Sequence, residues 1–227
     1  MTMELVSLLL LAFGLGLLHA LDADHVIAVS GLSCRKQQSS LLFCARWALG
    51  HGGALLLIGV AVLFLGMAIP ETLSAYAEMA VGAVLIIIGV FVFWDVIRQR
   101  AHLHFHSHDG IEHHAHWHSH QHTEEKHADD AHHHNHAPLF VGLLHGVAGS
   151  APLLALLPLT QMSPWAGVSY LLLFGLGVFI AMLIFGGLLK HLFNGLTRWG
   201  NPLINGIRVM VSLISIAYGG FLLVNLS

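Results

Sequence analysis

The first long apolar segment of the chain holds two histidines and two aspartates within seven residues. His19, Asp22, Asp24 and His25 lie in the stretch Gly-Leu-Leu-His-Ala-Leu-Asp-Ala-Asp-His. A carboxylate near the centre of a bilayer costs roughly 2.5–3.5 kcal/mol, so two of them there predict a functional site. Imidazole nitrogens combined with carboxylate oxygens suit a divalent transition metal such as nickel, cobalt or zinc. This segment therefore predicts a metal site inside the membrane.

The spacing of these residues indicates how they could share one ion. On a regular helix His19, Asp22 and His25 lie on one face, because residues three positions apart are neighbours. Asp24 points away from that face unless the helix unwinds, so its alternative role is to fix the tautomer of a ligating imidazole. Two other apolar segments each hold one histidine, for which a hydrogen bond to a neighbouring helix is the alternative. The candidate metal ligands are His19, Asp22, Asp24, His25, His51 and His145.

The composition of the whole chain is that of a polytopic membrane protein. Apolar residues make up 56% of the 227 residues and charged residues 9%, and the mean hydropathy is +0.75. Six apolar stretches are long enough to cross about 30 Å of hydrocarbon as helices. They lie at about Glu4–Ser30, Arg46–Ile69, Leu73–Trp94, Pro138–Thr160, Pro164–Leu189 and Pro202–Leu226. We therefore expect an all-α fold with six transmembrane helices.

The two halves of the chain resemble each other. Gly16-Leu-Leu-His19 in the first span is matched by Gly142-Leu-Leu-His145 in the fourth, and Gly89-Val-Phe91 in the third by Gly219-Gly-Phe221 in the sixth. Because three spans per half is an odd number, the second half must be inserted upside down relative to the first. We expect two inverted three-helix repeats with a substrate site at their interface. The expected divisions are 1–100 for the first repeat, 101–137 for a central loop and 138–227 for the second repeat.

All nine lysines and arginines flank three loops on one side of these spans. These loops follow the first, third and fifth spans. The positive-inside rule places them in the cytoplasm and both termini outside the cell membrane. Glu78, in the third span, is expected near the outer interface, with a role in ion access as the alternative. The expected partners are the bilayer and divalent metal ions, and no nucleic acid.

The central loop is rich in histidine. Fifteen of the twenty histidines lie between His102 and His136, interleaved with aspartates and glutamates. Such a segment cannot bury a core, so we expect it to be disordered without metal. Most of its imidazoles are unprotonated at neutral pH and able to bind metal. The loop therefore predicts a cytoplasmic arm that collects or buffers metal ions, and a solvated linker is the alternative.

The sequence around the first site resembles a known signature. His-Ala-Leu-Asp-Ala-Asp-His, over His19–His25, is similar to the signature of the nickel/cobalt transporter family, and Leu49-Gly-His51 is similar to its second motif. Leu144-His-Gly-Val-Ala-Gly-Ser150, six spans and the histidine-rich loop resemble the urease-accessory-type nickel permease branch. This chain has fewer spans than the longer members. It also has Gly-Val-Ala-Gly-Ser where they carry acidic and hydroxyl residues.

The resemblance implies both ligands and partners. It implies that metal is recognised by His19, Asp24, His25 and His51. It also implies cytoplasmic nickel chaperones, or maturation proteins of urease or hydrogenase, as protein partners. We expect no resident cofactor, because nickel or cobalt is the transported substrate.

These features predict a secondary transporter that takes up nickel, or alternatively cobalt, bound near the bilayer midplane. Inward movement of a divalent cation gains about 4.6 kcal/mol per 100 mV of membrane potential, which favours uptake. Export of nickel, cobalt or zinc is the alternative direction. An intramembrane metalloenzyme is another alternative, but the chain has no His-Glu-x-x-His motif and we expect no enzyme activity. The third alternative is a metal sensor or metallochaperone anchor, in which the histidine-rich loop binds the metal and the spans only hold it at the membrane.

Overall fold

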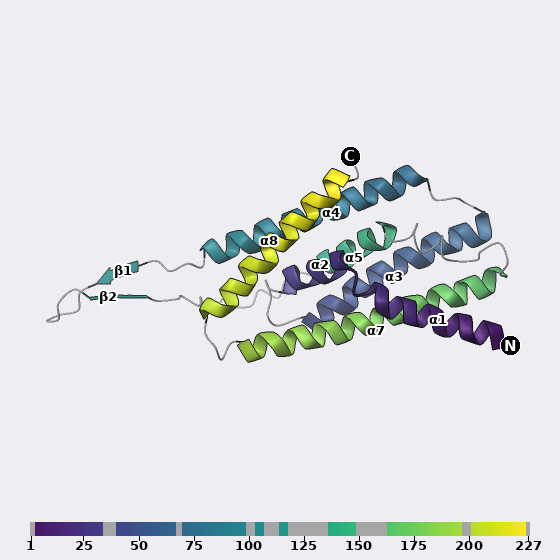
Figure 1. Ribbon diagram of the computed structural model, residues 1–227, viewed down its shortest axis with the longest axis horizontal. Helices are drawn as coiled ribbons and strands as arrows, with labels where there is room; N and C mark the ends of the chain where they lie inside the picture. Colours follow the sequence, from purple (N-terminus) through teal and green to yellow (C-terminus); the bar gives the residue numbers. More distant parts are fainter. Residues whose placement is uncertain are drawn as a thin grey trace, which may run out of the picture.

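The described part of the protein is helical apart from one short hairpin (Figure 1). The computed structural model describes residues 3–33, 40–66, 70–98, 103–106, 114–117, 136–148, 163–196 and 201–225. The helices are α1 (Met3–His19), α2 (Ala23–Ser33), α3 (Ser40–Leu65), α4 (Glu71–Arg98), α5 (Ala137–Ala148), α7 (Pro164–Leu196) and α8 (Asn201–Asn225). Strands β1 (Leu103–His106) and β2 (His114–Trp117) form the antiparallel hairpin.

The long helices are membrane-spanning in length and composition. Within the described residues, four helices are long and apolar enough to cross a bilayer: Leu41–Leu65, Thr72–Arg98, Pro164–Leu196 and Pro202–Asn225. Helices α1 and α2 would together make a fifth span, bent by 52°. Helix α5 has 12 residues, which is too short to cross by itself. The remainder of the fourth expected span, up to residue 160, lies outside the described residues.

The first expected span, over residues 4–30, consists of two helices with a break between them. Helix α1 ends at His19, and α2 begins at Ala23 after a three-residue turn. The carbonyl of Asp22 accepts the first hydrogen bond of α2, from the amide of Val26 at 3.0 Å. Aspartate is favoured immediately before a helix, and Asp24 lies in the first turn of α2, where the helix dipole stabilises a carboxylate. Acidic residues therefore start a second helix here instead of continuing the first.

The hairpin differs from the expectation of a loop without secondary structure. In β1 and β2, histidine alternates with an apolar residue, as in Leu-His-Phe-His and His-Ala-His-Trp. Alternation with a period of two is typical of a strand, and it overrides the polar composition over these eight residues. The remainder of the loop prediction lies outside the described residues.

Three pairs of helices meet at glycines. A β-carbon on the glycine would collide with the backbone of the partner helix in each case, so alanine is already too large. These contacts are Gly16 of α1 on Phe174 of α7, Gly142 of α5 on Trp47 of α3, and Gly219 of α8 on Gly82 of α4. Between these helices lies a core that includes the fully buried side chains of Trp47, Phe174 and Met182.

Helices α4 and α8 are also joined by polar contacts. Arg208, which is 7% exposed, donates a hydrogen bond to the carboxylate of Asp95. The Ser215 hydroxyl donates to the carbonyl of Leu85 at 2.6 Å, in the middle of the crossing. The two helices contact each other and cross in Figure 1, so both polar contacts fix how they cross.

We predict that Gly142→Ala lowers the thermal stability of the purified protein. The added methyl would force α5 away from the backbone of α3, and overpacking of this kind costs about 1–3 kcal/mol. Thermal unfolding in detergent measures the effect.

The matched control is Gly175→Ala in α7, where a β-carbon would meet nothing within 4 Å. That variant should be as stable as the parent or more stable, because alanine is the better helix former by about 1 kcal/mol. Equal stability of the two variants would contradict the role given to Gly142.

Candidate metal centre

Four histidines from four helices meet at one place. His19 ends α1, His25 lies in the first turn of α2, His51 is in α3 and His145 is in α5. The ring centre of His25 lies 4.7 Å from that of His19, 5.0 Å from that of His51 and 5.4 Å from that of His145. Three of the four, at 25, 51 and 145, are no more than 1% exposed. The structure thus brings together every histidine that the sequence singled out as a ligand.

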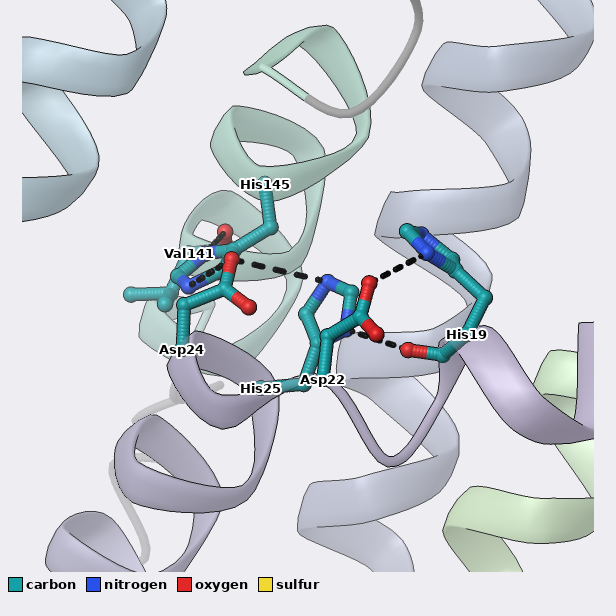
Figure 2. Close-up of polar contacts among 6 residues, drawn as sticks. All are labelled: His19, Asp22, Asp24, His25, Val141 and His145. Carbon is teal, nitrogen blue, oxygen red and sulfur yellow. Dashed lines mark hydrogen bonds and ion pairs between the residues drawn. The ribbon is translucent and has the colours of Figure 1, made fainter. Parts of the chain in front are cut away.

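Backbone carbonyls fix the tautomers of two of these rings. His25 donates from Nδ1 to the carbonyl of His19 at 2.9 Å, and His145 donates from Nδ1 to the carbonyl of Val141 at 2.8 Å (Figure 2). A neutral imidazole that donates from one nitrogen has a lone pair on the other. Both rings are therefore held with Nε2 ready to bind a metal ion, the arrangement found around protein metal sites.

Asp24 lies between these two rings. One oxygen of its carboxylate, Oδ2, is 3.9 Å from Nε2 of His25 and 4.0 Å from Nε2 of His145 (Figure 2). Two ligands that each bond one ion at about 2.1 Å can be at most about 4.2 Å apart. Both distances fall inside that limit. Asp24 is therefore within reach of both imidazoles, and the side chains would have to move closer together to place all three donor atoms around one ion.

Asp22 has a different position. Its Oδ2 is 2.7 Å from Nδ1 of His19, which it fixes as a hydrogen-bond donor and so leaves Nε2 of His19 with the lone pair. The sequence analysis counted both aspartates as candidate ligands and placed Asp24 off the shared face unless the helix unwinds. The helix is broken here, and Oδ2 of Asp24 lies near His25 and His145. One carboxylate oxygen each of Asp22 and Asp24 and one nitrogen of His25 also lie within 4.8 Å of one another.

His51 completes the cluster and has no partner of its own. Both of its nitrogens are buried without a hydrogen bond among the described residues, as are Nε2 of His19 and Nε2 of His145. A buried polar atom without a partner costs about 1–3 kcal/mol, which a metal ion would offset. One nitrogen each of His19, His25 and His51 lie within 4.8 Å of one another. Three equally spaced donors that each bond one ion at about 2.1 Å lie at most about 3.6 Å apart, so the cluster would contract on binding an ion.

Aromatic residues that the sequence analysis did not single out surround the imidazoles. Trp47 stacks on His51, with ring planes 8° apart and centres 5.1 Å apart, and its edge meets His25. Phe174 lies 5.3 Å from His19. The available signal was spacing, since Trp47 precedes His51 by one helical turn. These rings exclude water and restrict the rotation of the imidazoles.

A cavity of about 610 Å³ lies next to the cluster. Its walls include His19, Asp22, Asp24 and His25, together with Glu78 from α4. Glu78 was expected near an interface, with ion access as the alternative, and its place on this wall connects it to the site. His191 is exposed in α7 and does not line this cavity.

A family model covers most of the chain. Residues 24–220 match the family described as "Cytochrome C biogenesis protein transmembrane region". The chain is also 31% identical over 184 residues to the urease accessory protein UreH of Bacillus sp. (strain TB-90), a match that covers 80% of this chain and 75% of UreH. The chain belongs to the family of cytochrome c biogenesis transmembrane regions and to that of UreH. The resemblance to the urease-accessory-type branch is thereby confirmed.

A second relative matches a shorter stretch. The high-affinity nickel transport protein of Cupriavidus necator is 34% identical over 78 residues, which is 33% of this chain and 22% of that protein. No solved structure matches the chain. Family membership and the long apolar helices together make this a multi-pass membrane protein.

The different positions of the two aspartates give a prediction for nickel binding. Asp24→Asn should lower nickel affinity more than Asp22→Asn, because Asp24 faces two free nitrogens whereas Asp22 orients His19. Loss of an orienting residue typically costs about 10–100-fold in metal affinity, so Asp22→Asn should fall in that range. The measurement is calorimetric titration of the serine-loop chain, in which serine replaces every histidine from His102 to His136. A larger loss for Asp22→Asn would show that the assignment is reversed.

Proposed function

We propose that this protein transports nickel across the membrane as a secondary transporter, with the ion bound at the histidine cluster. The observation that carries the proposal is the convergence of four imidazoles and Asp24, with buried nitrogens that have no partner among the described residues. The names of the relatives, a urease accessory protein and a nickel transport protein, support nickel as the ion and transport, not catalysis, as the activity. Nickel is the cargo in this account, and cobalt is the closest substitute in chemistry.

The proposed ligands are Nε2 of His19, His25 and His145, one nitrogen of His51, and Oδ2 of Asp24. Asp22 holds His19 in the tautomer that leaves Nε2 free. Four imidazole ligands and one carboxylate favour a borderline ion such as nickel over magnesium or calcium, which prefer oxygen. The single carboxylate leaves the bound ion with a net positive charge, which helps it to leave again.

We further propose that the chain has six spans arranged as two inverted three-helix repeats. The repeat suggested by the sequence pairs Gly16 with Gly142, and their partners support this pairing. Gly16 packs on the backbone of Phe174 in α7, and Gly142 packs on the backbone of Trp47 in α3. An inverted repeat that exchanges α1 with α5 and α3 with α7 makes these two contacts equivalent.

The same exchange accounts for a second pair of contacts, one turn along each helix. Gly50 of α3 packs on the backbone of Leu139, three residues before Gly142. Gly177 of α7 packs on the backbone of Phe13, three residues before Gly16. Each glycine therefore has its counterpart at the corresponding place in the other half of the chain.

Helices α4 and α8 would then be the third spans of the two repeats and would cross on the axis between them. The sequence pairs Gly89 with Gly219, and the same register pairs Gly82 with Ser212. The observed contacts of Gly82 with Gly219 and of Gly89 with Ser212 are equivalent under this pairing. Rocking of the two halves about such an axis is how inverted-repeat transporters alternate access.

The two ends of α4 have different surroundings, and this difference supports a state that is open to one side of the membrane only. The cavity reaches the cluster beside Glu78, in the second turn of α4. At the other end of the same helix, Asp95 is bonded to Arg208 of α8. With both termini outside, the cavity would face the exterior and the ion pair the cytoplasm. An inward-moving cation is then driven by the membrane potential.

The histidine-rich loop would receive the ion on the cytoplasmic side. Its imidazoles can hold nickel that leaves the cluster and present it to cytoplasmic nickel chaperones or urease maturation proteins. This role does not require the loop to take part in translocation, because the proposed midplane ligands lie outside the loop.

We predict that His145→Ala abolishes uptake of radioactive nickel into proteoliposomes at micromolar nickel. His145 is the ligand that the second repeat supplies, and its loss leaves the ion bound by one half of the protein. His191→Ala, which removes an exposed histidine of the second repeat, should leave uptake within about twofold of the parent. Uptake by His145→Ala close to that of His191→Ala would contradict the shared site.

A further inference from the structure

The cavity beside the histidine cluster has a second polar wall that the proposed ligand set does not use. Glu78 of α4 and Tyr218 of α8 line it together with Asp22 and Asp24. Most other lining residues are apolar, among them Leu15, Val81 and Leu222. A carboxylate and a phenol among apolar side chains are costly in a membrane protein, so they indicate a functional role.

The contact between α4 and α8 fixes the backbone positions of Glu78 and Tyr218. Glu78 precedes Gly82 by one helical turn, and Tyr218 is next to Gly219. Gly82 and Gly219 pack on each other, and a β-carbon on Gly82 would lie 3.0 Å from the carbonyl oxygen of Gly219. The two polar residues therefore flank the place where the helices approach most closely, one from each proposed repeat. Their separation is set by packed backbone.

The charge of the cavity lining is negative. Asp22, Asp24 and Glu78 contribute three carboxylates, and none of the described lining residues is lysine or arginine. Arg208, the charged residue of α8, is engaged with Asp95 at the other end of the crossing. Among the described residues Glu78 has no ion pair. Carboxylates in a cleft with apolar walls concentrate cations by focusing the electric field.

A buried imidazole opens into the same space. His25 lines the cavity and is only 1% exposed, yet its Nε2 has no hydrogen bond among the described residues. The cavity volume of about 610 Å³ is large enough for an ion with its first hydration shell. The oxygen donors and the imidazole nitrogens that line the cavity would exchange that shell in stages.

We propose that Glu78, Tyr218 and Asp22 form a capture site for a hydrated divalent cation, from which the ion passes to the imidazoles. This inference rests on the proposed transport function and assigns it a second, weaker station. Oxygen donors hold a hydrated nickel ion loosely, so the site raises the local ion concentration without trapping the ion. Glu78 supplies the charge, and the Tyr218 hydroxyl supplies a neutral oxygen from the other repeat.

The test is nickel uptake by cells that express the full-length chain, measured against nickel concentration at low and high external salt. Glu78→Gln should raise the half-saturating nickel concentration about three- to tenfold at low salt, with the maximal rate within about twofold of the parent. High salt should shrink the difference, because mobile ions screen the carboxylate. Glu78→Asp should restore most of the capture, and Tyr218→Phe should raise the half-saturating concentration about twofold.

Tyr76→Phe is the matched control, because Tyr76 lies on the same helix as Glu78 and is 69% exposed. A Glu78→Gln half-saturating concentration equal to that of Tyr76→Phe at low salt would overturn the capture site. So would a lower maximal rate without a shift in half-saturation. If Glu78→Gln does not reach the membrane, an unchanged half-saturation for Tyr218→Phe overturns it.

Failure of the transport function itself would look different. The parent chain would then give no uptake above cells that lack it, and no variant could change the half-saturation. A transporting parent with an unaffected Glu78→Gln variant would remove the capture site and leave the histidine cluster in place.

Discussion

The break between α1 and α2 is the feature on which the metal centre depends. In a continuous helix the carbonyl of His19 would be bonded to the amide four residues on, and Asp24 would point away from His25. Because α1 ends at His19, that carbonyl accepts hydrogen bonds from the Asp22 amide of the turn and from the His25 ring. The ring is thereby held with Nε2 toward Asp24. Broken helices at substrate sites are typical of transporters, where irregular backbone is tolerated only inside the protein.

Glycines at the helix contacts set how closely His51 and His145 approach the other ligands. His51 and His145 reach the cluster because α3 and α5 touch backbone to backbone, at Gly142 and again where Gly146 packs on His51. Side chains at these positions would separate the helices by more than a metal–nitrogen bond can span. The same type of contact holds α4 against α8 beside the cavity. Packing of small residues, which is the usual basis of helix association in membranes, therefore sets both the site and its access.

The sequence predicted the membrane class and the residues that gather at the centre, because ionisable residues in apolar segments are rare enough to be informative. It did not predict the break, since neither proline nor glycine marks residues 20–22. The position of Asp24 therefore stayed conditional on unwinding of the helix, and Trp47, whose ring stacks on His51, was passed over because aromatic residues are common in membrane helices. The hairpin was missed because the polar composition of the loop was given more weight than the alternation of histidine with apolar residues. Contacts between distant glycines became visible only in three dimensions.

The central claim is that imidazoles from both halves of the chain and Asp24 bind one nickel ion. Nickel X-ray absorption spectroscopy on the serine-loop chain, loaded with one equivalent of nickel, tests it most directly, because the loop histidines cannot contribute to the signal. The account predicts imidazole nitrogens and a carboxylate oxygen at about 2.1 Å, with the outer-shell scattering of several imidazole rings, and fewer rings after His145→Ala. A first shell made only of oxygen atoms, or a spectrum that His145→Ala leaves unchanged, would contradict it.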